Sequence, residues 1–305
     1  MRVAGIDCGT NSIRLLVADI TDGSLTDVVR RMEIVRLGEG VDKTGRLSDA
    51  ALERTRKALA DYAAQIRDLG AERVRMVATS ASRDAANADE FTAMVTATLG
   101  VAPEVITGDE EAALSFGGAV RGLPSTAEAP FLVADIGGGS TEFVLGRDGV
   151  DAARSMDIGC VRMTERHLHD DPPTAAQIAA ATADIEAAVG TALGTVDPSR
   201  SARTLVGLAG SVTTVTALAL GLTEYDPTRI HHARVSYDDV TRVTASLLAE
   251  TRAERLAHGV MHPGRADVIG AGALILRVLM ERSGADEVIA SEHDILDGIA
   301  WSVGG

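Results

Sequence analysis

The chain has 305 residues, of which 46% are hydrophobic and 24% are charged, and its formal net charge is −15. This length suits two globular domains with sizeable cores, and the composition is that of an ordinary globular protein. The acidic excess argues against a duplex nucleic-acid-binding protein, which would neutralise phosphates with a basic face. A polyanionic substrate is not excluded, because a local site can be positive within an acidic molecule.

The first half of the chain alternates between strand and helix patterns. Residues 5–20, GIDCGTNSIRLLVADI, predict a strand, a tight glycine turn and a return strand. Apolar residues at helical spacing then predict a helix that Ser48 caps and Gly70 ends. The later elements are a buried strand over 73–80, a helix over 89–100, a strand over 102–107, and a helix over 108–123 that Thr107 and Glu110 open as a capping box. This alternation predicts an α/β unit.

The segment PSTAEAP at 124–130 predicts a domain boundary. The expected domains are residues 1–123 and 124–305, with the alternative that the last helix packs back on the first domain. The second half repeats the α/β pattern, with a glycine hairpin over 133–146. Helices are then expected over 174–194, 212–221, 236–250, 265–284 and 294–303, and strands over 204–211 and 286–291.

The two glycine hairpins share one pattern. Both contain D-x-G-x-x-S between apolar stretches, so that Asp7 matches Asp135 and Ser12 matches Ser140. The alternative is two unrelated hairpins, since turns often carry Gly, Asn and Asp. Two copies at the same spacing, each opening a long α/β segment, favour a duplicated unit. Such a turn presents backbone N–H groups and hydroxyls that suit phosphate oxygens.

Targeting signals and metal clusters are not expected from the sequence. The N-terminus MRVAGIDCGTNS lacks the basic and apolar regions of a signal peptide, and the apolar run over 266–280 is too short to span a bilayer. Two cysteines, Cys8 and Cys160, fit a reducing cytosol. We therefore expect a cytoplasmic protein that binds no membrane and no nucleic acid, and we interpret its seven histidines as surface residues rather than a zinc site.

Seven segments together resemble successive motifs of the exopolyphosphatase/guanosine pentaphosphate phosphohydrolase (Ppx/GppA) family. They are IDCGTNSIRLLV, TSASRDAANADEF, VITGDEEAALSFGGA, VADIGGGSTEFVLG, DIGCVRMTE, GLAGSVTTVTAL and RADVIGAGALIL. They occur in family order and cover nearly the whole chain. The resemblance implies two ribonuclease-H-like domains flanking a cleft, in the fold of the actin, sugar kinase and heat-shock chaperone ATPase superfamily. It also implies the short, two-domain form of the family, acting as a homodimer.

The same resemblance implies roles for individual residues. Glu111 is expected to be the general base, and Asp135 and Glu142 are expected to surround Mg²⁺, or Mn²⁺ in its place, and the attacking water, with Glu142 also catalytic. The residues expected at the substrate phosphates are Asp7, Gly9, Thr10, Asn11, Ser12, Arg83, Gly137, Gly138, Gly139, Ser140, Gly210, Ser211 and Arg265. Arg14 departs from some family members, and it either adds charge near the cleft or lies on the outer face of the hairpin.

These residue types suit phosphoryl transfer on chemical grounds. The reaction needs positioning, charge neutralisation and an oriented water. Arginine can bind phosphate with two hydrogen bonds, Mg²⁺ needs only one or two carboxylates, and a further carboxylate can accept the proton of water. Each choice has an ordinary alternative: Glu111 lies in a helical first turn, where acids are favoured anyway, Arg83 alone could be solvated, and Glu142 could face either side of its strand.

The expected function is that of an exopolyphosphatase that releases terminal orthophosphate from inorganic polyphosphate and favours short chains. Hydrolysis of guanosine pentaphosphate to the tetraphosphate uses the same chemistry and is the alternative within the family. A non-catalytic sensor of polyphosphate or an alarmone is a second alternative, and retention of Glu111 and Glu142 counts against it. The GDEEA segment and the short length disfavour a sugar kinase.

Overall fold

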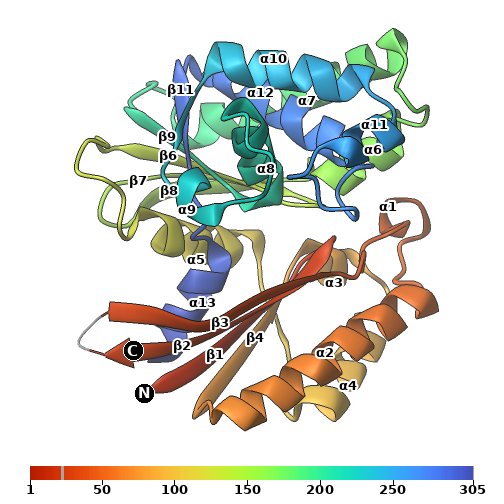
Figure 1. Cartoon of the computed structure of the whole chain (residues 1–305), viewed down its shortest axis with the longest axis vertical. Helices are drawn as coiled ribbons and strands as arrows, with labels where there is room; N and C mark the ends of the chain where they lie inside the picture. Colours follow the sequence, from red (N-terminus) through yellow and green to blue (C-terminus); the bar gives the residue numbers. More distant parts are fainter. Residues whose placement is uncertain (22–23, 305) are drawn as a thin grey trace. The chain divides into compact units, whose positions relative to one another are not determined.

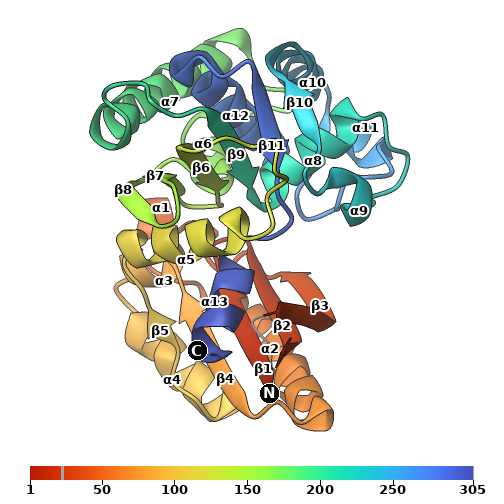
Figure 2. The same ribbon diagram turned by 90° about the vertical axis from the view of Figure 1, so that its left-hand side faces the viewer.

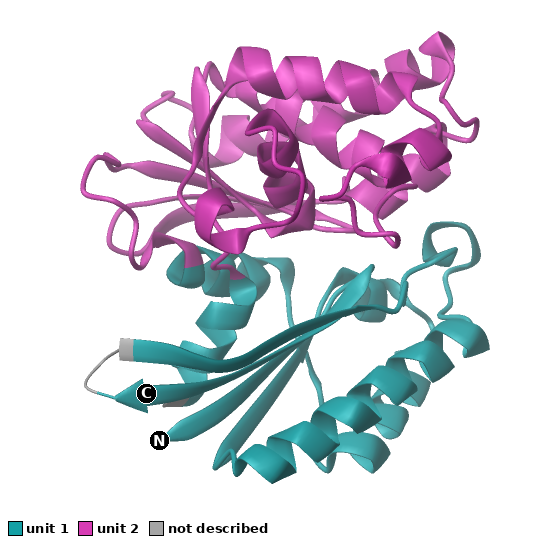
Figure 3. Cartoon of the chain, viewed as in Figure 1, with its two compact units in different colours: residues 1–118, 295–305 teal, residues 119–294 magenta. Residues whose placement is uncertain are grey.

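A computed structural model describes residues 1–21 and 24–304 and divides the chain into two α/β units (Figures 1 and 3). Unit 1 consists of Met1–Gly118 and Ile295–Gly305, and unit 2 of Ala119–Asp294. The observed division at 118/119 lies inside a helix, whereas the predicted boundary lies at 123/124. The C-terminal helix belongs to unit 1.

Unit 1 is built on a five-stranded sheet. Its strand order is β3-β2-β1-β4-β5, with β2 antiparallel to both neighbours and β4 and β5 parallel to β1. The strands are β1 (Arg2–Cys8), β2 (Ser12–Thr21), β3 (Ser24–Ile34), β4 (Arg73–Ala78) and β5 (Glu104–Val105), and the helices are α1 (Val41–Thr44), α2 (Asp49–Leu69), α3 (Ser80–Asp84), α4 (Ala88–Leu99), α5 (Gly108–Val120) and α13 (Ile295–Gly304).

Strand β1 is buried on both faces, and its side chains alternate between two cores. Ala4, Ile6 and Cys8 pack in a cluster with residues of α2 and α4, whereas Val3 packs with Leu296 of α13. Helix α13 lies against β1 and β2 of this sheet (Figure 2). Because successive side chains of a strand point to opposite faces, Asp7 lies on the same face as Val3.

Unit 2 repeats this topology and adds a strand. Its order is β10-β11-β9-β6-β7-β8, so that β8-β7-β6-β9-β11 corresponds to β3-β2-β1-β4-β5 of unit 1, with the same parallel and antiparallel pairings. The strands are β6 (Phe131–Ile136), β7 (Thr141–Gly146), β8 (Val150–Met156), β9 (Thr204–Leu208), β10 (Arg234–Ser236) and β11 (Glu287–Ala290), and the helices are α6 (Cys160–His167), α7 (Ala175–Val196), α8 (Ala209–Ala219), α9 (Pro227–Ile230), α10 (Tyr237–Ala249), α11 (Arg252–Ala257) and α12 (Ile269–Ser283).

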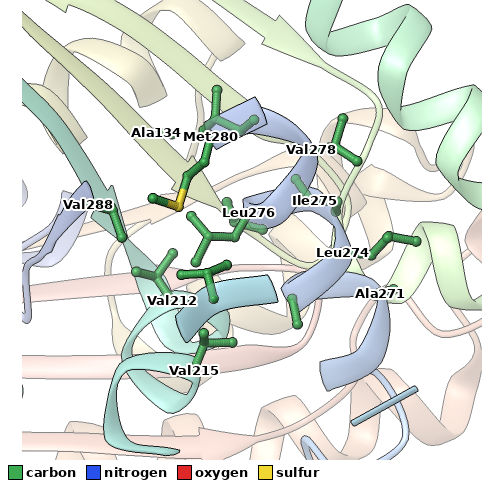
Figure 4. Close-up of a cluster of buried hydrophobic side chains, with 14 of the residues drawn as sticks. Ala134, Val212, Val215, Ala271, Leu274, Ile275, Leu276, Val278, Met280 and Val288 are labelled. Carbon is green, nitrogen blue, oxygen red and sulfur yellow. The ribbon is translucent and has the colours of Figure 1, made fainter. Parts of the chain in front are cut away.

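Helix α12 is the centre of the unit 2 core. Its residues from Ile269 to Leu276 are all buried, so it is apolar on every side. Figure 4 shows how it meets Val212 and Val215 of α8, Ala134 of β6 and Val288 of β11. A helix that is hydrophobic all round has to be enclosed by other elements. Its packing therefore fixes α8, whose first turn follows β9 directly.

Local signals in the sequence correctly predicted where several helices begin and end. Ser48 caps α2 through Ala51 N–H, and Gly70 ends that helix in the left-handed conformation. Thr107 and Glu110 form the predicted capping box at the start of α5. The repeated strand order confirms the predicted fold class of two ribonuclease-H-like α/β units. Among residues 1–21 and 24–304, no helix combines the length and the apolar character needed to cross a bilayer.

Candidate functional site

The two glycine hairpins lie at the carboxyl ends of the central strands, where ligands bind in open α/β sheets. In unit 1, β1 is followed by the turn over 9–11, and the adjacent strand β4 leads into α3, which carries Arg83. In unit 2, β6 is followed by the turn over 137–140, and the adjacent β9 leads into α8. The predicted site residues of each unit are therefore gathered at one edge of its sheet.

The carbonyl groups of the unit 2 glycine loop are held by helix α6. Cys160 N–H donates to the Gly137 carbonyl at 2.9 Å, and Val161 N–H donates to the Gly138 carbonyl at 2.9 Å. Arg162 completes the arrangement, because its Nε donates to the Gly139 carbonyl at 2.7 Å. The first N–H groups of a helix have no acceptor within the helix, and here the loop supplies acceptors for them.

These three bonds orient the N–H groups of the loop. The N–H and C=O groups of a trans peptide point in opposite directions. With the carbonyls of 137, 138 and 139 directed at α6, the N–H groups of Gly138, Gly139 and Ser140 point away from that helix. Within the described part of the chain, none of the three donates a hydrogen bond. The loop therefore presents three successive donors to an external acceptor, as in the backbone nests that bind phosphate.

The carbonyl groups of the unit 1 hairpin are also held by backbone hydrogen bonds, but the donors come from the segment 35–38 and not from a helix. Gly38 N–H donates to the Thr10 carbonyl at 2.9 Å, and the N–H groups of Val35 and Arg36 donate to the Asn11 carbonyl at 3.1 and 2.8 Å. The N–H groups of Asn11 and Ser12 consequently point away from the 35–38 segment. The Thr10 hydroxyl is 2.9 Å from that of Ser80, which ties the loop to the start of α3.

Each loop packs closely against a glycine that lies further along the chain. A Cβ atom at Gly159 would overlap the carbonyl group of Gly138, and a Cβ atom at Gly38 would overlap the Thr10 side chain. Neither residue was predicted to have a role in the site, although Gly159 lies in the quoted motif DIGCVRMTE. The sequence offered only one clue to these two glycines. Each of them comes a few residues after the third strand of its repeat.

Glu111 and Arg83 are paired in unit 1. The Arg83 Nη1 atom lies 3.3 Å from Glu111 Oε2 and also donates to the Ile106 carbonyl at 2.9 Å. The Glu111 side chain is 10% exposed. A neighbouring guanidinium favours the ionised form of a carboxylate, which is the form that accepts a proton. The sequence assigned Arg83 to phosphate, and the structure places it beside the predicted base.

Asp135 and Glu142 face each other across the unit 2 hairpin. They are register partners on β6 and β7, and both are buried. Ser155, the register partner of Glu142 on β8, donates its hydroxyl to Glu142 Oε1 at 2.7 Å. Opposite residues in an antiparallel pair have Cβ atoms about 4.5–5.5 Å apart, so the two side chains start close together on one face of the sheet.

This donor set fits Mg²⁺ better than a metal held entirely by protein side chains. No group of three or more His, Cys, Asp or Glu residues suited to a metal occurs among the described residues. Mg²⁺ uses oxygen ligands and is commonly bound by one or two carboxylates together with substrate phosphates and waters. Asp135 and Glu142 are the two residues that would hold it.

Three further predicted residues meet at the start of α8. Ala209 has a φ of 67°, an uncommon value for a residue with a side chain, and it turns β9 sharply into the helix. The Arg265 guanidinium lies against Gly210, where a Cβ would overlap it, and donates to Thr214 at 2.8 Å. Ser211 is buried against Cys160, whose thiol pKa is raised by burial.

The histidines form no metal cluster in the described chain, but some are not simple surface residues. His167 and His258 are paired with carboxylates, at 2.9 Å from Asp184 and Glu250. His231 stacks on both His232 and His293, with ring centroids 3.6 and 4.4 Å apart. Burial and the nearby His293 lower the pKa of His232. This group was not predicted, because His293 lies far along the chain from His231 and His232.

Among the described residues, the duplicated sheet topology and the three N–H donors of the unit 2 loop are features of α/β proteins that are suited to bind phosphate groups. The comparison of sequences agrees with this class. A model of the Ppx/GppA phosphatase family matches residues 16–303, and the chain belongs to this family.

Individual relatives cover the whole chain. Exopolyphosphatase 2 of Mycobacterium tuberculosis is 55% identical over 317 aligned residues, covering 100% of this chain and 99% of the relative. The guanosine-5'-triphosphate,3'-diphosphate pyrophosphatase of Vibrio atlanticus is 32% identical over 98% of this chain and 59% of its own length. A crystal structure of an exopolyphosphatase-like protein is 47% identical, covers 100% of this chain and 99% of its own, and superposes with a TM-score of 0.95.

We predict that Gly159→Ala weakens the binding of pyrophosphate. The added methyl group would overlap the Gly138 carbonyl and displace the peptides that orient the loop donors. Loss of one hydrogen bond to a charged group costs about 1.5–3 kcal/mol, so affinity should fall roughly 10–100-fold. Isothermal titration with pyrophosphate measures this. Gly149→Ala is the control, since a Cβ there meets nothing within 4 Å. Unchanged affinity in Gly159→Ala would show that this contact does not position the loop.

Proposed function

We propose that this protein is an exopolyphosphatase, which hydrolyses the terminal phosphoanhydride bond of inorganic polyphosphate and releases orthophosphate. The orientation of the Gly138, Gly139 and Ser140 N–H groups is the observation that carries the phosphate-binding part of this proposal. The identity of 55% over the full length of exopolyphosphatase 2 supports polyphosphate as the substrate.

In the proposed reaction, the oxygen of a water molecule attacks the terminal phosphorus, and the bond from that phosphorus to the bridging oxygen breaks. The shortened chain leaves with the bridging oxygen. Glu111 accepts the proton of the water, and the ion pair with Arg83 orients its carboxylate. The glycine loop of unit 2 offers its N–H groups to phosphate oxygens, and the loop at Asn11 and Ser12 offers a second set in unit 1. Arg265, fixed by Thr214, adds positive charge beside Gly210.

We assign Mg²⁺ to Asp135 and Glu142, with Mn²⁺ as an alternative ion. Bound there, the ion would neutralise charge on the phosphate oxygens. Ser155 donates to Glu142 Oε1, and the β6–β7 register places Asp135 opposite Glu142. Phosphatases of this family are generally metal-dependent, which is consistent with the assignment.

Hydrolysis of guanosine pentaphosphate is the second candidate, favoured by the 32% identity to the Vibrio pyrophosphatase. It removes a terminal phosphate by the same chemistry, and the groups described above would serve both substrates. A sensor without turnover would not require a carboxylate oriented by an arginine at the position of Glu111, so the Arg83 pairing favours an enzyme.

We also propose that the protein works in the cytoplasm as a homodimer. Cys8 and Cys160 are both buried thiols, and burial raises the pKa of each, which keeps them protonated and unreactive. Unreactive, unpaired thiols suit a reducing compartment. Neither a nucleic acid nor a membrane is a proposed partner.

Comparison of three substrates tests the proposed function. We expect the pure protein with Mg²⁺ to release phosphate fastest from short polyphosphate, more slowly from long polyphosphate, and slowest from guanosine pentaphosphate. The preference for short chains follows from the net charge of −15, which offers little attraction to a long polyanion beyond the local site. Apparent affinity should fall as salt rises, because phosphate contacts release counterions.

A higher kcat/KM for guanosine pentaphosphate than for polyphosphate would support the second candidate instead. Binding of all three substrates without phosphate release would support a sensor.

Replacement of the proposed base should separate binding from turnover. Glu111→Gln keeps the size of the side chain but cannot accept the proton, so kcat should fall by about 10²–10⁴-fold while substrate affinity is retained. Single-turnover phosphate release and equilibrium titration measure the two effects. Glu110→Gln is the matched control, because Glu110 lies next to the base but serves only the capping box. Near wild-type turnover in Glu111→Gln would exclude it as the base.

Replacement of a proposed metal ligand should raise the metal requirement. Asp135→Asn removes one of the two carboxylates, so the Mg²⁺ concentration for half-maximal activity should rise at least about tenfold, since even indirect partners of a metal ligand contribute 10–100-fold. A titration of activity against free Mg²⁺ measures this. Asp148→Asn, an exposed acid between β7 and β8, is the control. Wild-type activity that persists in chelator would contradict the assignment.

A further inference from the structure

Helix α13, the last helix of the chain, contacts β1 on one side and α5 on another. On the β1 side, a Cβ atom at Gly5 would lie 3.2 Å from the Ile299 side chain and 3.4 Å from the Leu296 carbonyl oxygen. On the α5 side, a Cβ atom at Gly298 would lie only 2.1 Å from the Leu114 carbonyl oxygen. The backbone of α13 therefore packs directly against the strand that leads into the first glycine hairpin and against the helix that begins with the GDEEA segment (Figure 2).

The same helix lies beneath the Glu111–Arg83 pair. Leu114 follows Glu111 by three residues, so the two lie on one face of α5. Leu114 packs against a buried aliphatic cluster from β4, the segment before α5, and α13, which consists of Val77, Ile106, Ile295 and Ile299. The Ile106 carbonyl group accepts the hydrogen bond from Arg83 Nη1 at 2.9 Å, and the same nitrogen lies 3.3 Å from Glu111 Oε2. Helix α13 thus packs against residues that hold both partners of the pair.

A side chain at position 298 can be accommodated only if α5 moves. Real Cβ atoms essentially never lie within 3.0 Å of another heavy atom, so a methyl group at 298 must separate the two helices at Leu114. Leu296 and Gly298 are two residues apart and lie on nearly opposite sides of α13. Because Leu296 already meets β1 at Gly5, α13 has no room to retreat toward the sheet. A displacement of about 1 Å in α5 is enough to matter, since such a misplacement can lower a rate by about 10²-fold.

We propose that Gly298 is a positioning residue for the general base. The close approach of α13 at this glycine sets where α5 lies, and α5 in turn places the Glu111 carboxylate where it accepts the proton of the attacking water. Gly298 acts through α5, so it contributes to turnover and not to the binding of phosphate. This inference rests on the proposed role of Glu111, and it makes the last helix of the chain part of the framework that holds the base.

Gly298→Ala tests the inference when it is made both alone and together with Glu111→Gln. Alone, we expect it to lower kcat for short polyphosphate by roughly 10–100-fold, while the affinity for pyrophosphate, measured by isothermal titration, stays that of wild type. In the Glu111→Gln background, we expect it to lower kcat no further, because two changes that act through one group are not additive. Gly117→Ala, also on α5, is the matched control, since a Cβ there meets nothing within 4 Å.

A milder variant keeps the test decisive if Gly298→Ala does not fold, as judged by circular dichroism and thermal melting. Ile295→Val removes one carbon from the cluster beneath Leu114, and it should lower kcat in the wild-type background but not in the Glu111→Gln background. A folded variant with wild-type kcat, an equal loss of kcat in both backgrounds, or a loss of pyrophosphate affinity as large as the loss of kcat would overturn the inference and leave Glu111 as the base. Near wild-type turnover in Glu111→Gln alone would overturn the proposed base, and the inference with it.

Discussion

The orientation of a few peptide planes is the constraint on which the site depends. A loop can offer N–H groups to phosphate only if its carbonyl groups are turned the other way and are satisfied there. In unit 2 the acceptor side of the loop is matched to the first turn of α6, which needs acceptors for its own N–H groups. The N–H groups of the first turn of α6 therefore bond to the carbonyl groups of the loop, and the N–H groups of the loop point away from α6. Gly159 allows this contact because a side chain there would separate the helix from the loop.

The duplication shows which parts of this arrangement are general. Unit 1 orients its loop with the 35–38 segment instead of a helix, yet the carbonyls that are held belong to equivalent positions, Thr10 and Asn11 in place of Gly138 and Gly139. In both units the supporting segment follows the third strand of the sheet. The strand order, not the type of support, is therefore what the two halves have in common.

Charge is handled locally in this acidic protein. The net charge of −15 would repel a polyanion at long range, but the groups at the carboxyl edges are arranged in pairs that limit the repulsion. Arg14 is bonded to Asp7, and Arg83 is bonded to Glu111. Asp135 and Glu142 are register partners, and Ser155 donates to Glu142. A fixed array of N–H donors suits phosphoryl transfer, which requires positioning and charge neutralisation more than covalent chemistry.

The sequence by itself determined the elements and the loops, because the signals for them are local. Apolar periodicity, capping residues such as Ser48 and Thr107, and the repeated D-x-G-x-x-S turn all act within a few residues. They predicted the α/β repeat and the two glycine hairpins. The resemblance to a known family singled out Glu111, which no local signal distinguishes from its neighbour Glu110.

Only the tertiary structure decided which residues hold these site residues in place. The contact of Gly159 with Gly138, the pairing of Arg14 with Asp7 and the bond from Arg83 to Glu111 join segments that strand pairing and helix packing bring together. Such contacts depend on register and on the return of the chain across the sheet, and neither is encoded in the residues on one side of the contact alone.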